Sequence, residues 1–211
     1  MFAKNYAEYY DLFNQSKPYE EEIKFVYRWA ENPKSIFDIG AGTGSYWKYY
    51  PPKIKISGID LSKEMLKNGD KRIVQGDITK YKHAGKVDCV TALFDVLNYV
   101  HKHDWWENLP LGNGGYFIFD IWDKEKVDKQ GFSRTAKSVG NVTRIIKPID
   151  YDGREVMLQI DIEDSKGSFS EIHRMYLYSQ RDIERFCGND FDIFEIKPTG
   201  TWQLWFKLKR K

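Results

Sequence analysis

Cysteine, histidine and net charge are all scarce in this sequence of 211 residues. It holds 2 cysteines and 4 histidines, and 33 basic residues against 31 acidic ones leave a formal charge of +2. Cys89 and Cys187 belong to no CxxC pair or Cys/His cluster, so we expect two small buried side chains and no bound metal. A charge this close to zero lacks the one-signed field that binding to a phosphate backbone requires. We therefore expect no nucleic acid partner.

Long apolar runs are also missing. No stretch approaches the roughly 20 residues that a membrane helix needs, and the opening MFAKNYAEYYDLF lacks the basic and apolar regions of a signal peptide. These absences predict a cytoplasmic protein with no membrane partner. Hydrophobic residues make up 41% of the chain, a share typical of a folded domain. The length suits one domain over residues 1–211.

Short apolar runs alternate with helical segments in the first part of the chain. Helical spacing predicts two helices within 2–31 and shorter ones at 46–50, 63–68 and 104–108. Strands are predicted at 35–39, 54–59, 72–75, 87–94 and 116–122. This alternation predicts a parallel sheet with right-handed crossover connections.

The pattern changes after residue 130. Strand-like runs at 142–149, 154–162 and 168–178 are separated by turn residues typical of hairpins, which predicts three inserted antiparallel strands within 131–178. A helix from 179 to 187 and two final strands, at 191–197 and 202–209, complete the prediction.

A glycine-rich turn follows the first predicted strand. Gly40, Gly42 and Gly44 have the spacing GxGxG, which lets a ligand approach backbone N–H groups. Asp38 lies two residues before the first of these glycines. A pyrophosphate gains nothing from a neighbouring carboxylate, whereas a ligand that carries an ammonium and a sulfonium does. The turn therefore favours a positively charged cofactor.

Two more carboxylates end the next predicted strands. Asp60, twenty residues after Gly40, is placed to accept both hydroxyls of a ribose. Asp77, within Gly76-Asp77-Ile78, can accept an adenine amino group while a backbone N–H serves a ring nitrogen. All these positions lie at the carboxyl ends of neighbouring parallel strands, where open α/β sheets bind ligands.

Taken together, these segments resemble the class I S-adenosylmethionine-dependent methyltransferases. The matching stretches are DIGAGTG at 38–44, GIDLSKEML at 58–66, GDI at 76–78, TALFDVLNYV at 91–100 and GNGGYFIFDIW at 112–122. The resemblance implies an α/β, Rossmann-like sheet of seven mostly parallel strands with the last one antiparallel, beside the inserted antiparallel sheet. It implies S-adenosyl-L-methionine as cofactor, with contacts from Asp38, Gly40, Gly42, Gly44, Asp60, Leu61, Met65, Asp77, Ile78 and Phe94.

Two other stretches, YAEYYDLFNQSKPYEEE at 6–22 and SEIHRMYLYSQRDIERF at 170–186, are similar to small-molecule N-methyltransferases of the amino-sugar type. This likeness implies that residues 1–31 form a helical lid, with Tyr10 and Tyr19 near the methionine end of the cofactor. It also implies that the inserted strands contribute to dimer contacts and to the acceptor pocket. The acceptor residues it implies are Asp120, Trp122, His173 and Arg174, and Asp120 and His173 are the candidates for removing a proton from the acceptor.

The predicted reaction is methyl transfer to an amine of a small molecule, such as an amino sugar. A small-molecule O-methyltransferase is the alternative within the same chemistry. An NAD-dependent oxidoreductase is a third reading, although Asp77 and the absence of the third fingerprint glycine count against it. A protein that binds S-adenosylmethionine without catalysis is the fourth.

Overall fold

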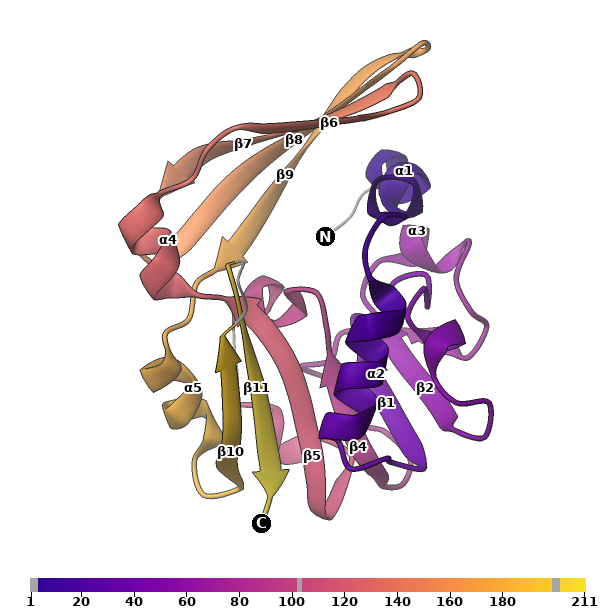
Figure 1. Cartoon of the computed structure of the whole chain (residues 1–211), viewed down its shortest axis with the longest axis vertical. Coiled ribbons are helices and arrows are strands. Elements are labelled where there is room, and N and C mark those ends of the chain that lie inside the picture. Colours follow the sequence, from indigo (N-terminus) through magenta and orange to yellow (C-terminus); the bar gives the residue numbers. More distant parts are fainter. Residues whose placement is uncertain (1–3, 102–103, 199–201) are drawn as a thin grey trace.

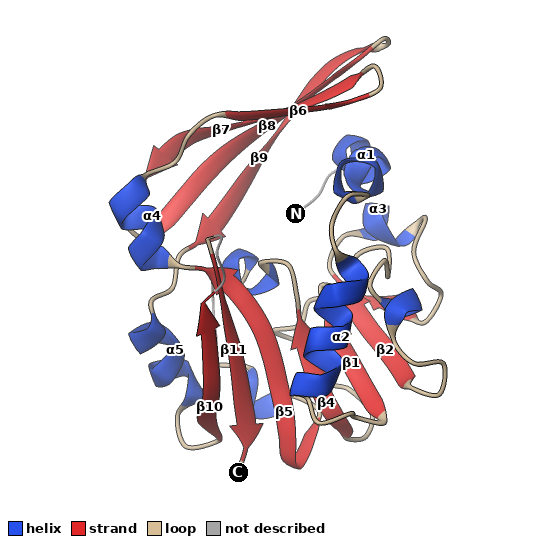
Figure 2. Cartoon of the chain, in the orientation of Figure 1, coloured by secondary structure: helices blue, strands red, loops and turns tan. Residues whose placement is uncertain are grey.

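Two β-sheets organise the chain, as a computed structural model of residues 4–101, 104–198 and 202–211 shows (Figures 1 and 2). The larger sheet has the strand order β10-β11-β5-β4-β1-β2-β3. Its strands are β1 (Ser35–Ile39), β2 (Lys55–Asp60), β3 (Ile73–Gln75), β4 (Val87–Ala92), β5 (Leu111–Trp122), β10 (Phe191–Pro198) and β11 (Gln203–Arg210).

Strands β3, β2, β1, β4 and β5 run parallel, and β11 pairs antiparallel with both β5 and β10. The predicted seven-stranded sheet with an antiparallel last strand is therefore confirmed. The central strands β4 and β5 are continuous apolar runs because both of their faces are covered. Val90, Phe117 and Phe119 are fully buried there.

The described residues also form helices and 3₁₀ turns. They are α1 (Lys4–Asn14), α2 (Tyr19–Trp29), α3 (Lys63–Leu66), α4 (Lys124–Gln130) and α5 (Gln180–Cys187), with 3₁₀ turns η1 (Trp47–Tyr49), η2 (Val96–Tyr99) and η3 (Trp106–Asn108). The predicted helices at 46–50 and 104–108 are thus single 3₁₀ turns, and each ends just before a proline-containing segment that stops further winding. Helix α4 was not predicted; it begins at Asp123, whose carboxylate accepts the N–H groups of Glu125 and Lys126.

The inserted sheet has four antiparallel strands, β6 (Thr135–Val139), β7 (Val142–Tyr151), β8 (Glu155–Asp164) and β9 (Gly167–Tyr176). The prediction of three strands missed β6, because its side chains are mostly exposed and do not alternate between apolar and polar. This sheet arches over the carboxyl ends of the parallel strands, and α1 lies opposite it (Figure 1). Its inner face buries Val156, Leu158 and Ile160 on alternate positions of β8.

Candidate active site

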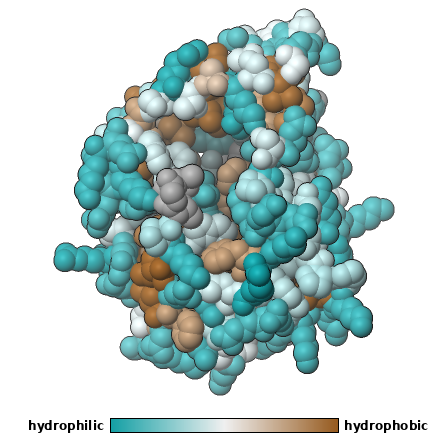
Figure 3. Space-filling model, viewed as in Figure 1, coloured by the Kyte–Doolittle hydropathy of each residue, from teal (hydrophilic) through white to brown (hydrophobic). Residues whose placement is uncertain are grey.

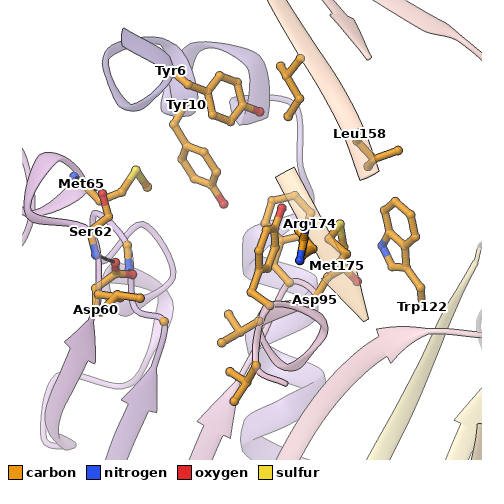
Figure 4. A pocket seen from close by; sticks show the side chains of 18 of the residues that line it. Tyr6, Tyr10, Asp60, Ser62, Met65, Asp95, Trp122, Leu158, Arg174 and Met175 are labelled. Carbon is orange, nitrogen blue, oxygen red and sulfur yellow. Dashed lines mark hydrogen bonds between the residues drawn. The ribbon is translucent and has the colours of Figure 1, made fainter. Parts of the chain in front are cut away.

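A cavity of about 910 Å³ lies between the carboxyl edge of the larger sheet, the inserted sheet and α1. The molecule is visibly hollowed beneath the inserted sheet (Figure 3), and side chains from all three parts point into the hollow (Figure 4). Most of the residues predicted for the site line this cavity: Tyr10, Gly40, Gly42, Asp60, Leu61, Met65, Asp77, Ile78, Phe94, Trp122 and Arg174. The other five, which are Tyr19, Asp38, Gly44, Asp120 and His173, are not among its lining residues.

Asp60 is fixed at the end of β2 by backbone hydrogen bonds. One carboxylate oxygen accepts the N–H of Gly42 at 2.8 Å and the other accepts the N–H of Ser62 at 2.7 Å. Gly42 has a left-handed backbone (φ +59°), and a Cβ there would lie 3.2 Å from the Met65 Cε. Burial raises the pKa of Asp60 above its ordinary value. Each oxygen keeps acceptor capacity on the cavity side, as a pair of ribose hydroxyls requires.

Asp77 follows β3, the next strand along the same edge, and also lines the cavity. The backbone N–H and the hydroxyl of Thr79 both donate to it, at 3.0 and 2.7 Å. Although partial burial opposes this effect, these bonds and the nearby Lys80 hold the pKa of Asp77 below its usual range. Asp77 is therefore an ionised acceptor beside the apolar side chain of Ile78, which suits the edge of a nucleobase.

Asp38 has a different environment from the one expected for a ligand contact. It is buried, and it accepts hydrogen bonds from the Thr91 hydroxyl at 2.6 Å and from the Trp47 indole N–H at 2.8 Å. Burial raises the pKa of Asp38 to about 6. The carboxyl thus joins β1, β4 and η1 beneath the glycine turn.

Two other predicted residues also lie outside the lining. The ring of Tyr19 packs edge-on against Tyr46, with centroids 4.9 Å apart, and stacks with Tyr49. Gly44 serves the turn itself: its backbone is left-handed (φ +79°), and an added Cβ would lie 3.3 Å from the side chain of Asp70. Tyr19 and Gly44 therefore pack behind the residues that line the cavity and do not line it themselves.

The segment after β4 forms the floor of the cavity in an unusual conformation. Phe94 and Asp95 both have left-handed backbones, with φ of +71° and +62°, which is costly for residues with side chains. Asp120, fully buried at the end of β5, accepts the N–H of Phe94 at 2.6 Å and that of Asp95 at 3.1 Å. Gln203 adds a bond to the same carboxylate at 2.9 Å. Asp120 therefore shapes the floor from below, while Asp95 lines the cavity.

His173 is also fully buried, on the inner face of β9. Its Nδ1 lies 3.0 Å from the hydroxyl of Tyr99, and its Nε2 lies 3.4 Å from a carboxylate oxygen of Glu171. Tyr99 lines the cavity, so His173 reaches the site through this phenol. Asp95 and Tyr99 were missed from the sequence, although they are spaced i, i+4 within the recognised run TALFDVLNYV at 91–100.

Helix α1 bridges the two halves of the molecule across the cavity. On one side, the backbone N–H of Tyr6 donates to Glu171 at 3.1 Å and the Tyr9 hydroxyl donates to Asp164. On the other, Asp11 accepts the hydroxyls of Thr43 and Ser45 in the glycine turn, at 3.0 and 2.9 Å. α1 therefore lies where a lid would lie.

The half of the cavity under the inserted sheet is mainly apolar and aromatic. The rings of Trp122, Phe132 and Trp202 form a triangle with centroids 5.5 to 6.0 Å apart. Two arginines also line this half. Arg174 pairs with Glu155 at 3.0 Å, and Arg144 donates to the Tyr6 hydroxyl at 3.1 Å.

Within residues 4–101, 104–198 and 202–211, no group of three His, Cys, Asp or Glu side chains could hold a metal ion. In the same ranges no helix has the length and apolar character needed to cross a membrane.

Comparison with known proteins agrees with this architecture. Residues 36–110 match the family model described as a methyltransferase domain. A protein of Geobacillus sp. (strain WCH70) whose name places it among the methyltransferases is 25% identical over 149 residues, which cover 61% of this chain and 60% of that protein. The chain spans less than two thirds of the length of each curated relative that it matches.

Two solved structures share the fold over almost the whole chain. An S-adenosylmethionine-dependent methyltransferase from Clostridium acetobutylicum has a TM-score of 0.80 at 22% identity, covering 96% of both chains. CalS10, an amino pentose methyltransferase from Micromonospora echinaspora solved with S-adenosylmethionine, has a TM-score of 0.78 at 16% identity, covering 100% of this chain and 98% of its own. Residues 36–110 therefore match a methyltransferase domain, and the chain has the fold of S-adenosylmethionine-dependent methyltransferases, which confirms the resemblance stated from the sequence.

Proposed function

We propose that this chain, built around a methyltransferase domain, transfers a methyl group from S-adenosylmethionine to an amine of a small molecule such as an amino sugar. The observation that carries the proposal is the division of one cavity into two chemically distinct halves. One half, at the edge of the parallel strands, has the polar groups of a nucleoside site. The other, under the inserted sheet, is aromatic and apolar.

The nucleoside half fits S-adenosylmethionine by its donor and acceptor chemistry. Asp60 offers both carboxylate oxygens for ribose hydroxyls, and Asp77 with Ile78 offers an acceptor and an apolar surface for adenine. Leu61 and Met65 add apolar lining between them. We assign the methionine end of the ligand to the region of Gly40, Tyr10 and Phe94, which closes the cavity beneath α1.

The acceptor half suits a small molecule better than a polymer. It is roofed by the inserted sheet and by α1, so a long chain would have to displace α1 to enter. The aromatic triangle of Trp122, Phe132 and Trp202 offers faces on which a sugar ring or other compact acceptor can pack. That CalS10 methylates an amino pentose supports an amine as the acceptor group.

S-adenosylmethionine supplies an activated methyl group, which is displaced directly by the acceptor. The protein's own contribution is then to align the acceptor, exclude water and hold the protons of the amine. The apolar roof excludes water from this half of the cavity. The left-handed turn at Phe94 and Asp95 sets the shape of the floor between the two halves.

The test is a reaction of the purified chain with S-adenosylmethionine and a panel of amino pentoses and amino hexoses, each paired with the matching hydroxy sugar. We expect S-adenosylhomocysteine and a product heavier by one CH₂ group with at least one amine, detected by mass spectrometry. The Asp60→Ala variant is the control for cofactor dependence. Methylation of the hydroxy sugars alone would replace the proposal by O-methylation.

Cofactor identity is tested separately by titration calorimetry with S-adenosylmethionine and with NAD. Binding of the first and not the second is expected, because Asp60 and Asp77 offer no favourable contact to a pyrophosphate. Binding without turnover across the amine and hydroxyl panels would favour a non-catalytic binding protein.

A further inference from the structure

Three side chains form a continuous hydrogen-bonded chain that ends at the cavity. Glu171 contacts the Nε2 of His173 at 3.4 Å, and the His173 Nδ1 contacts the hydroxyl of Tyr99 at 3.0 Å. Glu171 and His173 come from β9, whereas Tyr99 comes from η2. Tyr99 is the member of this chain that lines the cavity.

We propose that Tyr99 is the catalytic residue that takes a proton from the acceptor amine, with His173 and Glu171 as the positioning residues that receive its own proton. This rests on the proposed function and names the residue that would do its proton chemistry. It also changes the role expected of His173, which acts through a phenol instead of touching the acceptor.

The direction of each hydrogen bond follows from the tautomer that we assign to His173. A carboxylate can only accept, so in the neutral ring the nitrogen that faces Glu171, Nε2, carries the proton. Nδ1 is then the acceptor nitrogen, and the Tyr99 hydroxyl donates to it. A phenol that donates its proton still has an oxygen that can accept, and Tyr99 lines the cavity, where a ligand N–H would approach it.

The proposed step conserves protons and electron pairs. An ammonium acceptor gives one proton to the Tyr99 oxygen while the Tyr99 hydroxyl proton passes to His173 Nδ1. This produces a neutral amine, a neutral phenol and an imidazolium that faces the Glu171 carboxylate. The amine lone pair can then attack the methyl group, and the carbon–sulfur bond pair leaves with the sulfur. The imidazolium releases its proton to water when the site opens.

Two carboxyl groups at the floor of the cavity, Asp120 and Asp95, are less suited to the role. Asp120 is fully buried beneath the floor and does not line the cavity, so its carboxylate does not reach an acceptor there. Asp95 lines the cavity, but burial and then the charge of Asp120 raise its pKa well above the ordinary value, which favours its protonated form.

Helix α1 completes the chain from the other side. Its Tyr6 backbone N–H donates to the second oxygen of Glu171 at 3.1 Å, and the Tyr6 ring packs edge-on against His173 at 5.7 Å. The titratable side chains in contact with His173 include Glu171 on its own strand and the phenols of Tyr6 and Tyr99, and Arg144 donates to the Tyr6 hydroxyl. The pairing of β9 with β8 sets the register of Glu171 and His173, and α1 adds a hydrogen bond to the first and a ring contact to the second.

Glu171→Gln is the sharpest variant because the Tyr6 N–H dictates how the new amide is oriented. The amide oxygen must face the Tyr6 N–H, so its NH₂ group faces His173 Nε2. Nε2 must then accept and Nδ1 must carry the ring proton. Shape and the bond to α1 are preserved, but Tyr99 loses the acceptor for its proton.

The experiment combines a tautomer measurement with turnover. ¹⁵N-histidine NMR of the full chain bound to S-adenosylhomocysteine, with His173 assigned by His173→Gln, should show the Nε2–H tautomer in the wild type and Nδ1–H in Glu171→Gln. With the amine identified by the panel, Tyr99→Phe and Glu171→Gln should each lower kcat about 10²-fold or more. Their Kd for S-adenosylmethionine should stay within about twofold.

Tyr151→Phe is the matched control. It removes a phenol that donates to Asp128 outside the cavity lining, and it should keep full turnover.

Either of two results would overturn the proposed role of Tyr99, His173 and Glu171: an unchanged His173 tautomer in Glu171→Gln, or full turnover in Tyr99→Phe. The tautomer measurement needs no acceptor. Absence of methyl transfer with every amine would therefore count against the proposed function and leave the hydrogen-bonded chain to be judged by NMR alone.

Discussion

Asp120 holds the backbone of Phe94 in a left-handed conformation by accepting its N–H at 2.6 Å from beneath the cavity. The same carboxylate accepts the N–H of Asp95 at 3.1 Å, so two strained residues in a row are stabilised by one side chain. The acid at the end of β5 thereby determines the shape of the turn at the end of β4. The sequence predicts that Asp120 contacts the acceptor, whereas in the structure its carboxylate holds the backbone of this turn.

The first prediction concerns this turn. In Asp120→Asn the amide NH₂ replaces an oxygen that accepts from Asp95 and Gln203, so a donor would face donors. We expect the free energy of unfolding to fall by about 2 kcal/mol, the usual cost of an unsatisfied buried group. S-adenosylmethionine affinity should fall as well, because Phe94 and Asp95 line the cavity. Urea unfolding and calorimetry measure the two effects.

Asp192→Asn on β10 is the control for this variant, because its carboxylate is 68% exposed and lies outside the cavity lining. It should change neither quantity. An Asp120→Asn protein with wild-type stability and affinity would show that the turn holds its shape without the carboxylate.

The second prediction concerns the ribose contact. Asp60→Ala removes an acceptor that is held by Gly42 and Ser62 toward the cavity. We expect S-adenosylmethionine binding to weaken by roughly 1 to 3 kcal/mol, since buried hydroxyls would lose a charged partner. Calorimetry measures the change, with Asp192→Ala as the exposed control. A dissociation constant equal to that of the wild type would remove Asp60 from the ribose site.

Much of the larger sheet was predictable because local signals and topology agree there. The runs that form β1, β4 and β5 are apolar and bounded by turn residues, and a parallel sheet is the one arrangement that buries them on both faces. The positions of Asp60 and Asp77 were predictable for a related reason, because the carboxyl ends of parallel strands meet at one edge of the sheet. Strand β6 was missed because a mostly exposed strand carries no hydrophobic period.

The interior of the site was harder to predict than its edge. A sequence places Asp38 at the end of a strand but does not show that Thr91 and Trp47 occupy both of its oxygens. It likewise places His173 on a strand without showing that Tyr99, from a distant segment, lies between it and the cavity. These relationships depend on which side chains meet across elements, and a single sequence carries no signal for that pairing.

The third prediction concerns the closure of α1. Asp11 ties this helix to the glycine turn through the hydroxyls of Thr43 and Ser45. Asp11→Ala removes both bonds. Because they are partly exposed to water, we expect the free energy that holds α1 against the glycine turn to fall by about 1 kcal/mol. The dissociation rate of S-adenosylmethionine should then rise roughly fivefold. Stopped-flow displacement measures the rate. Glu20→Ala, an exposed acid on α2 paired with Lys24, is the control and should leave it unchanged.

The fourth prediction is a pH dependence of stability that belongs to Asp38. Burial raises its pKa in the folded state to about 6, above the ordinary value of 3.8. The folded protein therefore holds this proton more tightly than the unfolded chain. The associated stabilisation is fully present below the ordinary value and is lost as the pH rises through about 6. Its size is about 3 kcal/mol.

Asp38→Asn removes this titration and keeps the shape of the side chain. The variant will have a different stability at every pH, because an amide cannot accept from both Thr91 and Trp47, so the informative quantity is the slope. We expect the wild type to lose about 2.5 kcal/mol relative to the variant between about pH 4 and about pH 7.5, since at pH 4 a small part of the stabilisation is already lost. Urea titrations followed by tryptophan fluorescence measure both proteins. Taking the difference cancels the titrations that they share, including those of Asp95 and Asp120, and two parallel curves would mean that Asp38 titrates normally.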